Sequence, residues 1–205
     1  MGNPTARVLR ASILLACVCF PAYGLAEVHL GFDQSNYSVS AGGTVKAQVR
    51  IDGLGDLTAP SLSAFDLVIS YDPSILRPTG AVYGDPILGN QLDLAGLGSL
   101  DTTPVIAPPL PVGIASVAFD LPTTLDTLQR GAFTLATISF SGLAEGNSPL
   151  AISMVLALAD SEGNPLTATV SGATVTVAVP EPSAVVILIV GMLGMMGWAA
   201  RRRIG

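Results

Sequence analysis

The chain has 205 residues, 50% of them hydrophobic, and a formal net charge of −6. All 15 acidic residues fall between Glu27 and Glu181, where four basic residues accompany them, so this stretch carries a net charge of −11. This excess of negative charge excludes a nucleic-acid-binding protein and argues against adhesion to an anionic membrane. With one histidine and two cysteines, the chain also offers few groups for nucleophilic or metal chemistry.

The first 26 residues are typical of a secretory signal peptide. Arg7 and Arg10 precede an apolar run over residues 11–20, and small residues occupy the −3 and −1 positions of a cleavage site between Ala26 and Glu27. The run is too short to cross roughly 30 Å of hydrocarbon as a helix. We therefore expect residues 1–26 to be removed and the remainder of the protein to be exported.

A second reading of the same segment is a lipoprotein processing box. Residues 14–17 resemble such a box, with Cys17 as the lipidated residue. This reading leaves about six apolar residues between Arg10 and Cys17, shorter than the usual ~7–15. Cleavage after Ala26 would instead remove both cysteines, and the mature chain would then have neither a disulfide nor a cysteine metal ligand.

Residues 27–178 predict a single all-β domain. From Thr44 to Ile51, apolar residues alternate with polar ones, and residues 64–71 alternate in the same way. Clusters of Gly, Pro, Asn and Asp separate such runs. Many short strands with turns between them indicate a two-sheet antiparallel β-sandwich. The period-two pattern recurs at Val28–Phe32, Ala115–Leu121, Leu150–Leu158 and Thr174–Val179.

Two segments of this domain depart from the strand pattern. Residues 123–130 predict one or two helical turns, with Leu125 and Leu128 facing inward. Leucines interleaved with glycine after Gly89 either form an exposed apolar patch for a partner or fold back over a sheet edge. These leucines are Leu92, Leu94, Leu97 and Leu100.

The pattern of strands and turns resembles a cohesin domain. Tyr37–Val45 and Phe65–Leu76, which contains the YDPS element Tyr71–Ser74, are similar to its opening half. Phe133–Phe140 and Gly172–Val177 fit its late strands. The resemblance implies a nine-stranded jelly-roll sandwich and non-catalytic binding of dockerin modules or association with polysaccharide. Carbohydrate-binding modules of related architecture share much of the pattern, so sugar binding is a further alternative.

Nothing in the sequence indicates an enzyme. The only histidine, His29, is out of phase with its apolar neighbours in the predicted strand, so we expect it to face solvent. No nucleophile elbow and no ordered Ser–His–Asp arrangement surrounds it in the sequence. Many aspartates are present, but no pattern singles out a carboxylate pair for glycoside hydrolysis.

Calcium is the one cofactor that the sequence suggests. Asp160, Glu162 and Asn164 place oxygen ligands at alternating positions around a glycine, as hard cations prefer. The bidentate glutamate of the twelfth loop position is missing, since Ser171 stands there. The alternative for this segment is a hairpin turn after the Leu150–Leu158 strand.

The C-terminus has three parts in a fixed order. Val179, Pro180, Glu181 and Pro182 form an extended segment, because each proline disfavours helix at and before its position. The apolar run 184–200 follows, which as a helix covers about 26 Å, the short end of what spans a bilayer. The chain then continues with Arg201, Arg202 and Arg203, which we expect to stay on the cytoplasmic side.

In this order and spacing, residues 179–205 resemble the PEP-CTERM sorting signal of Gram-negative bacteria. The resemblance implies recognition by an exosortase, a membrane transpeptidase-like enzyme, with cleavage close to the Pro-Glu-Pro element. It also implies a producing organism that makes exopolysaccharide. A plain membrane anchor is the alternative. We expect transient anchoring in the inner membrane, then a place at the cell surface or outside the cell, with exopolysaccharide or a dockerin-like protein as the partner.

Overall fold

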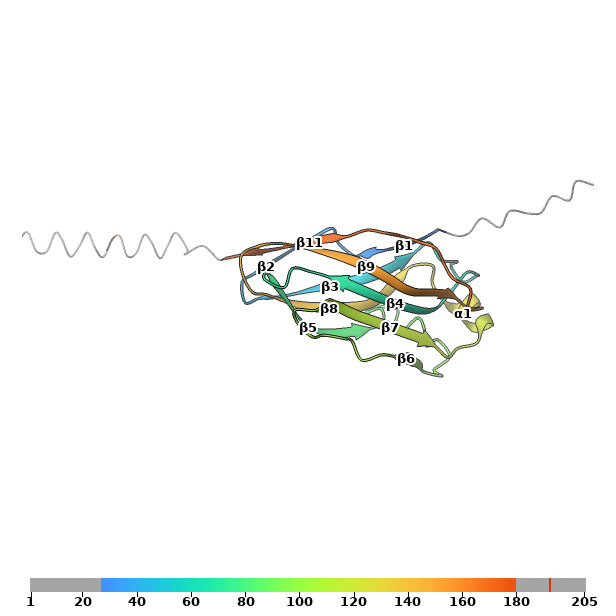
Figure 1. The fold of residues 1–205 in the computed structure, drawn as a ribbon. Coiled ribbons are helices and arrows are strands. Elements are labelled where there is room, and N and C mark those ends of the chain that lie inside the picture. Colours follow the sequence, from blue (N-terminus) through green and yellow to red (C-terminus); the bar gives the residue numbers. More distant parts are fainter. Residues whose placement is uncertain (1–26, 180–191, 193–205) are drawn as a thin grey trace, which may run out of the picture.

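The computed structural model describes residues 27–179 and Met192, and two β-sheets account for most of the first range (Figure 1). One sheet contains, in spatial order, β10 (Ala168–Val170), β1 (Val28–Phe32), β3 (Thr44–Asp52), β8 (Phe133–Gly142) and β5 (Leu76–Tyr83). The other contains β2 (Asn36–Ser40), β11 (Ala173–Ala178), β9 (Gly146–Asp160), β4 (Leu62–Ser70), β7 (Val112–Ala118) and β6 (Ser99–Asp101). The predicted all-β, two-sheet sandwich is confirmed.

The strand pairings are antiparallel except at the two ends of the chain. β1 runs parallel to β10, and β2 runs parallel to β11. The chain changes sheet between β1 and β2 and again between β10 and β11, so its first and last segments each add a strand to both sheets. This crossing explains why the described residues form 11 strands, two more than the nine that the cohesin resemblance implied.

Alternation along β3 and β4 places the core as the sequence predicts. Ala47, Val49 and Ile51 of β3 are fully buried, as are Leu67 and Ile69 of β4. Burying one such side chain completely contributes about 1.5–3 kcal/mol relative to leaving it exposed. All strands of the described residues and the core cluster lie within residues 28–178, so we expect this stretch to fold on its own.

β9 does not keep the period of two. Its register against β4 shifts three times, and at two of these shifts Ser153 and Leu156 have no partner opposite them in β4. Such bulges bend the strand and change which way the following side chains point. Met154, Val155 and Leu156 are all exposed as a result, although they are consecutive in the sequence.

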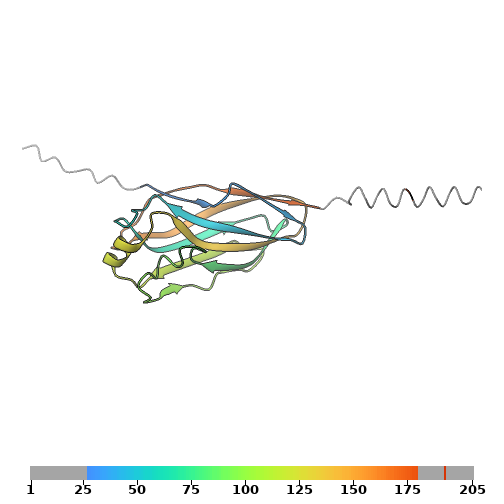
Figure 2. The same ribbon diagram turned by 180° about the vertical axis from the view of Figure 1, so that it is seen from behind.

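The short helix α1 (Pro122–Leu128) lies at the end of the sandwich where β1 begins (Figures 1 and 2). The prediction that Leu125 faces inward is confirmed, since it is 1% exposed. The prediction for Leu128 was wrong, because its side chain is 52% exposed. The helix ends at Leu128 and Gln129 enters the core in its place. β11 ends at the opposite end of the sandwich, so the described chain enters at one end and leaves at the other.

Candidate binding face and sorting segment

The outer face of the five-stranded sheet is polar. Lys46 of β3 lies opposite Ser139 of β8, and Gln48 lies opposite Thr137. Arg77 of β5 lies opposite Ser141. Paired residues in an antiparallel ladder share one face, so charged and hydroxyl side chains make up most of this surface. Val82 of β5, opposite Thr137, is an exposed apolar residue on it. Such a surface needs no partner to be stable in water.

The outer face of β9, β4, β7 and β6 is apolar instead. In β4, alternate residues point into the core, namely Phe65, Leu67 and Ile69, so the residues between them lie on the outer side. The strand pairings place residues of the neighbouring strands on the same side. We call it the apolar face and define it by three rows: Leu100, Val117, Ala64 and Ala159; then Ala115, Asp66 and Ala157; then Gly113, Val68 and Met154.

Several large side chains on and beside the apolar face are exposed. Val117 is 42% exposed, Leu100 57% and Met154 53%. Leu156, the bulged residue of β9, is 58% exposed, and Phe119, just after β7, is 54% exposed. Asp66 brings a charge to the middle row, where both neighbours are alanine. Contiguous apolar surface of this kind marks interaction sites more often than singly exposed residues do.

The glycine-interleaved leucines are divided between the core and this surface. Leu92 is buried at 2% exposure, which agrees with folding back over a sheet edge. Leu97 and Leu100 are 60% and 57% exposed, which agrees with the alternative of an apolar patch. Leu100 lies in β6 opposite Val117 and so extends the apolar face to the edge of the sheet.

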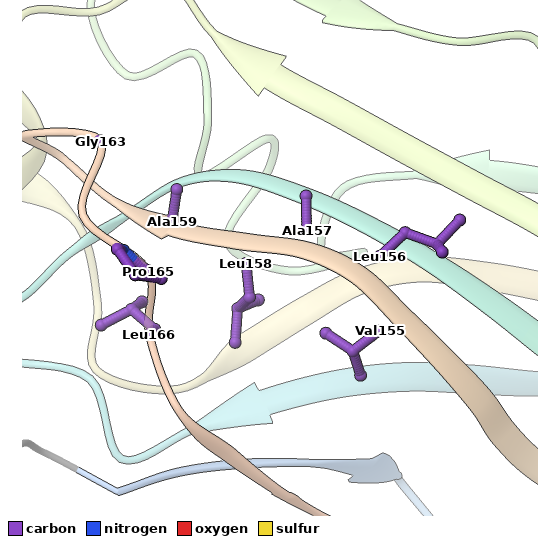
Figure 3. Close-up of a pocket in the computed structure, with 8 residues that line it drawn as sticks. All are labelled: Val155, Leu156, Ala157, Leu158, Ala159, Gly163, Pro165 and Leu166. Carbon is purple, nitrogen blue, oxygen red and sulfur yellow. The ribbon is translucent and has the colours of Figure 1, made fainter.

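An apolar hollow of about 360 Å³ lies beside β9 (Figure 3). One wall is β9 from Val155 to Ala159, and the other is the returning segment with Gly163, Pro165 and Leu166. The Leu166 N–H donates to the Leu158 oxygen at 2.9 Å, which closes the hollow at one end. β11 leaves β9 at Leu150, so among the described strands none pairs with that side of β9 between Leu150 and Leu158. The hollow is open to solvent, and apolar side chains make up most of its lining.

The predicted calcium segment forms a tight turn. Asp160 Oδ1 accepts the N–H groups of Glu162 at 3.0 Å and Asn164 at 2.8 Å, and Oδ2 accepts the Asn164 amide at 3.1 Å. The Asp160 N–H donates to the Asn164 oxygen at 2.9 Å, as in a hairpin. Among the described residues, no three His, Cys, Asp or Glu side chains gather as a metal cluster. A calcium ion bound by Asp160, Glu162 and Asn164 stays a prediction, and it would share the Asp160 carboxylate with these donors.

His29 faces solvent, as the sequence predicts, with 40% of its side chain exposed. Its Nδ1 lies 3.2 Å from Asp52 Oδ2 on the polar face of the five-stranded sheet. Ser171 lies beside this pair, because a Cβ built on Gly31 would stand 2.5 Å from Ser171 Oγ and 2.9 Å from His29 Cε1. Sequence reasoning missed this grouping because the three residues come from distant segments. No hydrogen bond in the described part joins His29 to Ser171, and a base needs that contact to activate a hydroxyl.

The described chain ends where the predicted sorting segment begins. Ala178, the last residue of β11, pairs with Ser40, and its oxygen accepts the Ala41 N–H at 2.9 Å. Val179 follows with 54% exposure. The residues 180–182 and 201–203, the apolar run 184–200 apart from Met192, and Ala26 lie outside the described residues. In the part that the structure describes, no helix is long and apolar enough to cross a membrane.

Comparison with protein families decides the nature of this segment. Residues 178–203 match the PEP-CTERM protein-sorting motif. The chain carries a PEP-CTERM sorting motif. The resemblance seen in the sequence is thereby confirmed, and the motif implies an exported protein that exosortase processes. Comparison with curated proteins gave no match.

The sandwich that precedes the PEP-CTERM motif is similar to solved cohesins. A type I cohesin from a cohesin–dockerin complex of Clostridium thermocellum aligns with a TM-score of 0.57 and 15% identity, covering 74% of this chain and 99% of the cohesin. The seventh ScaB type I cohesin of Pseudobacteroides cellulosolvens gives 0.58 and 13%, covering 77% and 96%. A non-cellulosomal cohesin of Archaeoglobus fulgidus gives 0.53 and 14%, covering 76% and 94%. The domain therefore has a cohesin-like fold.

Proposed function

We propose that this protein is an exported, non-catalytic surface or matrix component that exosortase sorts and that binds a partner protein through the apolar face. The observation that carries the binding role is the contrast between the two outer faces of the sandwich. One pairs Lys46 with Ser139 and Gln48 with Thr137, whereas the other exposes Val117, Leu100 and Met154. A fold that needed only solubility would have no reason to keep one face apolar.

A dockerin-like module is the partner that the fold favours. The type I cohesin of Clostridium thermocellum was solved in complex with a dockerin, and its fold covers 74% of this chain. The apolar face has Asp66 as the charged member of its three rows, so contact there depends mainly on apolar burial. The net charge of −11 over residues 27–181 adds a preference for a partner that is neutral or basic.

Sugar binding has less support. Carbohydrate recognition usually uses exposed aromatic rings with one apolar face. Tyr37 is 5% exposed, and the Tyr71 hydroxyl donates to the Leu110 oxygen at 3.0 Å. The Tyr83 hydroxyl donates to the Thr102 oxygen at 2.9 Å. These bonds hold the mature domain's tyrosines against the protein, and Phe119, which is 54% exposed, is an aromatic ring left open to a sugar. Association with exopolysaccharide stays a prediction that does not require a sugar site on the sandwich.

The binding role is tested by affinity capture. Residues 27–179 are immobilised, exposed to extracellular material of the producing strain, and bound protein and glycan are analysed together. Val117→Asp places a charge on the apolar face, and Val82→Asp is the control, because Val82 is 70% exposed on the other sheet. We expect one protein to be captured by the native domain and by Val82→Asp but at least tenfold less by Val117→Asp, roughly the effect of losing one central interface contact. Equal capture by both variants would refute the apolar face as the binding surface.

Sorting is tested separately in the producing cell. Glu181→Ala with Pro182→Ala removes the Pro-Glu-Pro element, and we expect the full-length precursor to accumulate in the membrane fraction. A native chain that is never shortened there would contradict the sorting function. A variant that is shortened as fast as the native chain would show that the enzyme reads other residues.

A further inference from the structure

The sorting motif begins inside the folded domain. The motif covers residues 178–203, and Ala178 is also the last residue of β11. Ala178 lies opposite Ser40 of β2, and the Ala41 N–H donates to its oxygen at 2.9 Å. The strand and the motif therefore share a residue, and no linker separates the sandwich from the segment that the processing enzyme reads.

Covalent geometry limits how far the Pro-Glu-Pro element can stand from the fold. Glu181 is three positions beyond Ala178, and a fully extended chain spans at most about 3.6 Å per residue. Glu181 is thus within about 11 Å of the end of β11 as long as that strand stays paired. An enzyme that encloses the Pro-Glu-Pro element must therefore also contact the sandwich.

β11 is paired too firmly to detach and so increase the distance between the sandwich and the Pro-Glu-Pro element. It lies between β2 and β9, with five residues paired to each. Val175 and Val177 point into the core and are 0% and 1% exposed. Peeling the strand away would expose both valines and break a pairing on each side. The segment is therefore presented with the fold intact up to Ala178.

The end of the sandwich around Ala178 is formed by three turns that backbone hydrogen bonds join to one another. The Gly42 N–H donates to the Gly142 oxygen at 2.8 Å, and the Leu143 N–H donates to the Ile75 oxygen at 2.8 Å. A Cβ on Gly142 would stand 2.9 Å from Val177 and 3.1 Å from the Ser40 oxygen, so the turns pack directly against β11. Leu143 projects from this surface with 49% exposure.

We propose that this end of the sandwich, formed by residues 40–43, 72–75 and 142–146, is a contact surface for the exosortase. The inference rests on the sorting function proposed above and adds the surface through which the folded domain takes part in it. The enzyme acts on a chain whose β11 is still paired, and it touches Leu143 and its neighbours while it does so. Processing then leaves the product with little chain beyond the last strand.

The test compares two leucines of equal exposure at opposite ends. Leu143→Arg alters the proposed contact, and Leu128→Arg on α1 is the control, with exposures of 49% and 52% in the native chain. Each is made in the full-length protein in the producing strain, with and without ten Gly/Ser residues inserted between Val179 and Pro180. Pulse–chase labelling measures the rate at which precursor becomes product. The melting temperature of residues 27–179 carrying each change shows whether it folds.

We expect Leu143→Arg to slow processing about tenfold, the effect of losing one well-packed contact, and Leu128→Arg to leave it unchanged. With the insertion, the native chain and Leu143→Arg should be processed at the same rate, because the enzyme then no longer reaches the sandwich in either chain. A native rate for Leu143→Arg without the insertion would overturn the proposal, as would a difference between Leu143→Arg and the native chain that persists when both carry the insertion. Failure of the native chain to be processed at all would refute the sorting function instead.

Discussion

Replacing Gln129 by leucine tests how far a buried polar side chain holds the end of α1 and the β5–β6 loop against β4. Gln129 is 0% exposed. Its Oε1 accepts the Leu62 N–H at 2.5 Å, and its Nε2 donates to the oxygens of Leu62 and Gln91, both at 2.9 Å. Leucine has a similar size but no polar atom, so the substitution leaves three backbone groups without their partner.

Each buried polar group that loses its partner costs about 1–3 kcal/mol. Since the site can relax and leucine buries more apolar surface, we expect a loss of about 3–5 kcal/mol, the lower half of the simple sum. For a domain of this size, 1 kcal/mol corresponds to about 2–4 °C, so the melting temperature should fall by roughly 10 °C.

The measurement is thermal and urea unfolding of residues 27–179, followed by circular dichroism. Gln34→Leu is the matched control, because Gln34 is exposed and its amide contacts only the neighbouring Asp33, at 3.4 Å. Its free energy of unfolding should stay within about 0.5 kcal/mol of the native value. If Gln129→Leu also stays within about 1 kcal/mol, the reasoning from unpaired buried groups is refuted.

Three further predictions concern the same fragment. Phe140→Ala, at a core position with 0% exposure, should cost about 3–5 kcal/mol in urea unfolding, and a loss below about 1 kcal/mol would contradict the packing described. Burial raises the pKa of Asp85, but the carboxylate accepts hydrogen bonds from three backbone N–H groups, which lower the pKa. Their combined effect is the larger, so the pKa of Asp85 lies below its ordinary value. Asp85 therefore stabilises the fold above about pH 4 and loses this effect as pH falls through its folded pKa, so the deficit of Asp85→Asn should shrink in acid rather than grow. Calcium should shift the melting temperature by less than about 1 °C, because both carboxylate oxygens of Asp160 already accept hydrogen bonds. A saturable rise in melting temperature with calcium, abolished by Asp160→Ala, would instead establish the ion site.

Local patterns in the sequence predicted the parts of the fold that depend on local periodicity. Thr44–Ile51 became β3 with Ala47, Val49 and Ile51 inside, because a period of two sorts side chains between two faces whatever the rest of the chain does. β9 could not be predicted in the same way. Its bulges at Ser153 and Leu156 arise from how it fits β4, more than 80 residues earlier in the chain, and no local pattern announces them.

Local sequence patterns also fail to predict which polar residues are buried, as the core position of Gln129 shows. Periodicity favoured Leu128 as the second inward residue of the helix. In the structure, Gln129 takes that place because its amide satisfies the backbone of Leu62, 67 residues away. A glutamine is as compatible with a solvent-exposed helix end as with the core, and only the position of its partner decides between them.

The two candidate functional regions differ in what the sequence could predict for the same reason. The sorting motif is one continuous segment read along the chain, so its parts and spacing were visible without a structure. The apolar face is assembled from four strands between Ala64 and Ala159, and its residues are ordinary strand residues one at a time. Only the register shows that Val117, Ala64 and Ala159 form one row on the side that the core does not use.

The row of Val117, Ala64 and Ala159 lies away from the end of the sandwich where the sorting segment begins, so binding and sorting should use different surfaces. Val117 lies opposite Ala64, near the start of β4, whereas the sorting segment leaves the sandwich at Ala178, at the opposite end from α1 (Figure 1). A partner on this part of the apolar face should therefore not cover the end that the exosortase is proposed to contact. We expect Val117→Asp, for which we predict at least tenfold weaker capture of the partner, to be processed at the native rate in the full-length chain. Slow processing of this variant, with an unchanged melting temperature of its 27–179 fragment, would show that the enzyme uses the apolar face and that sorting and binding compete for one surface.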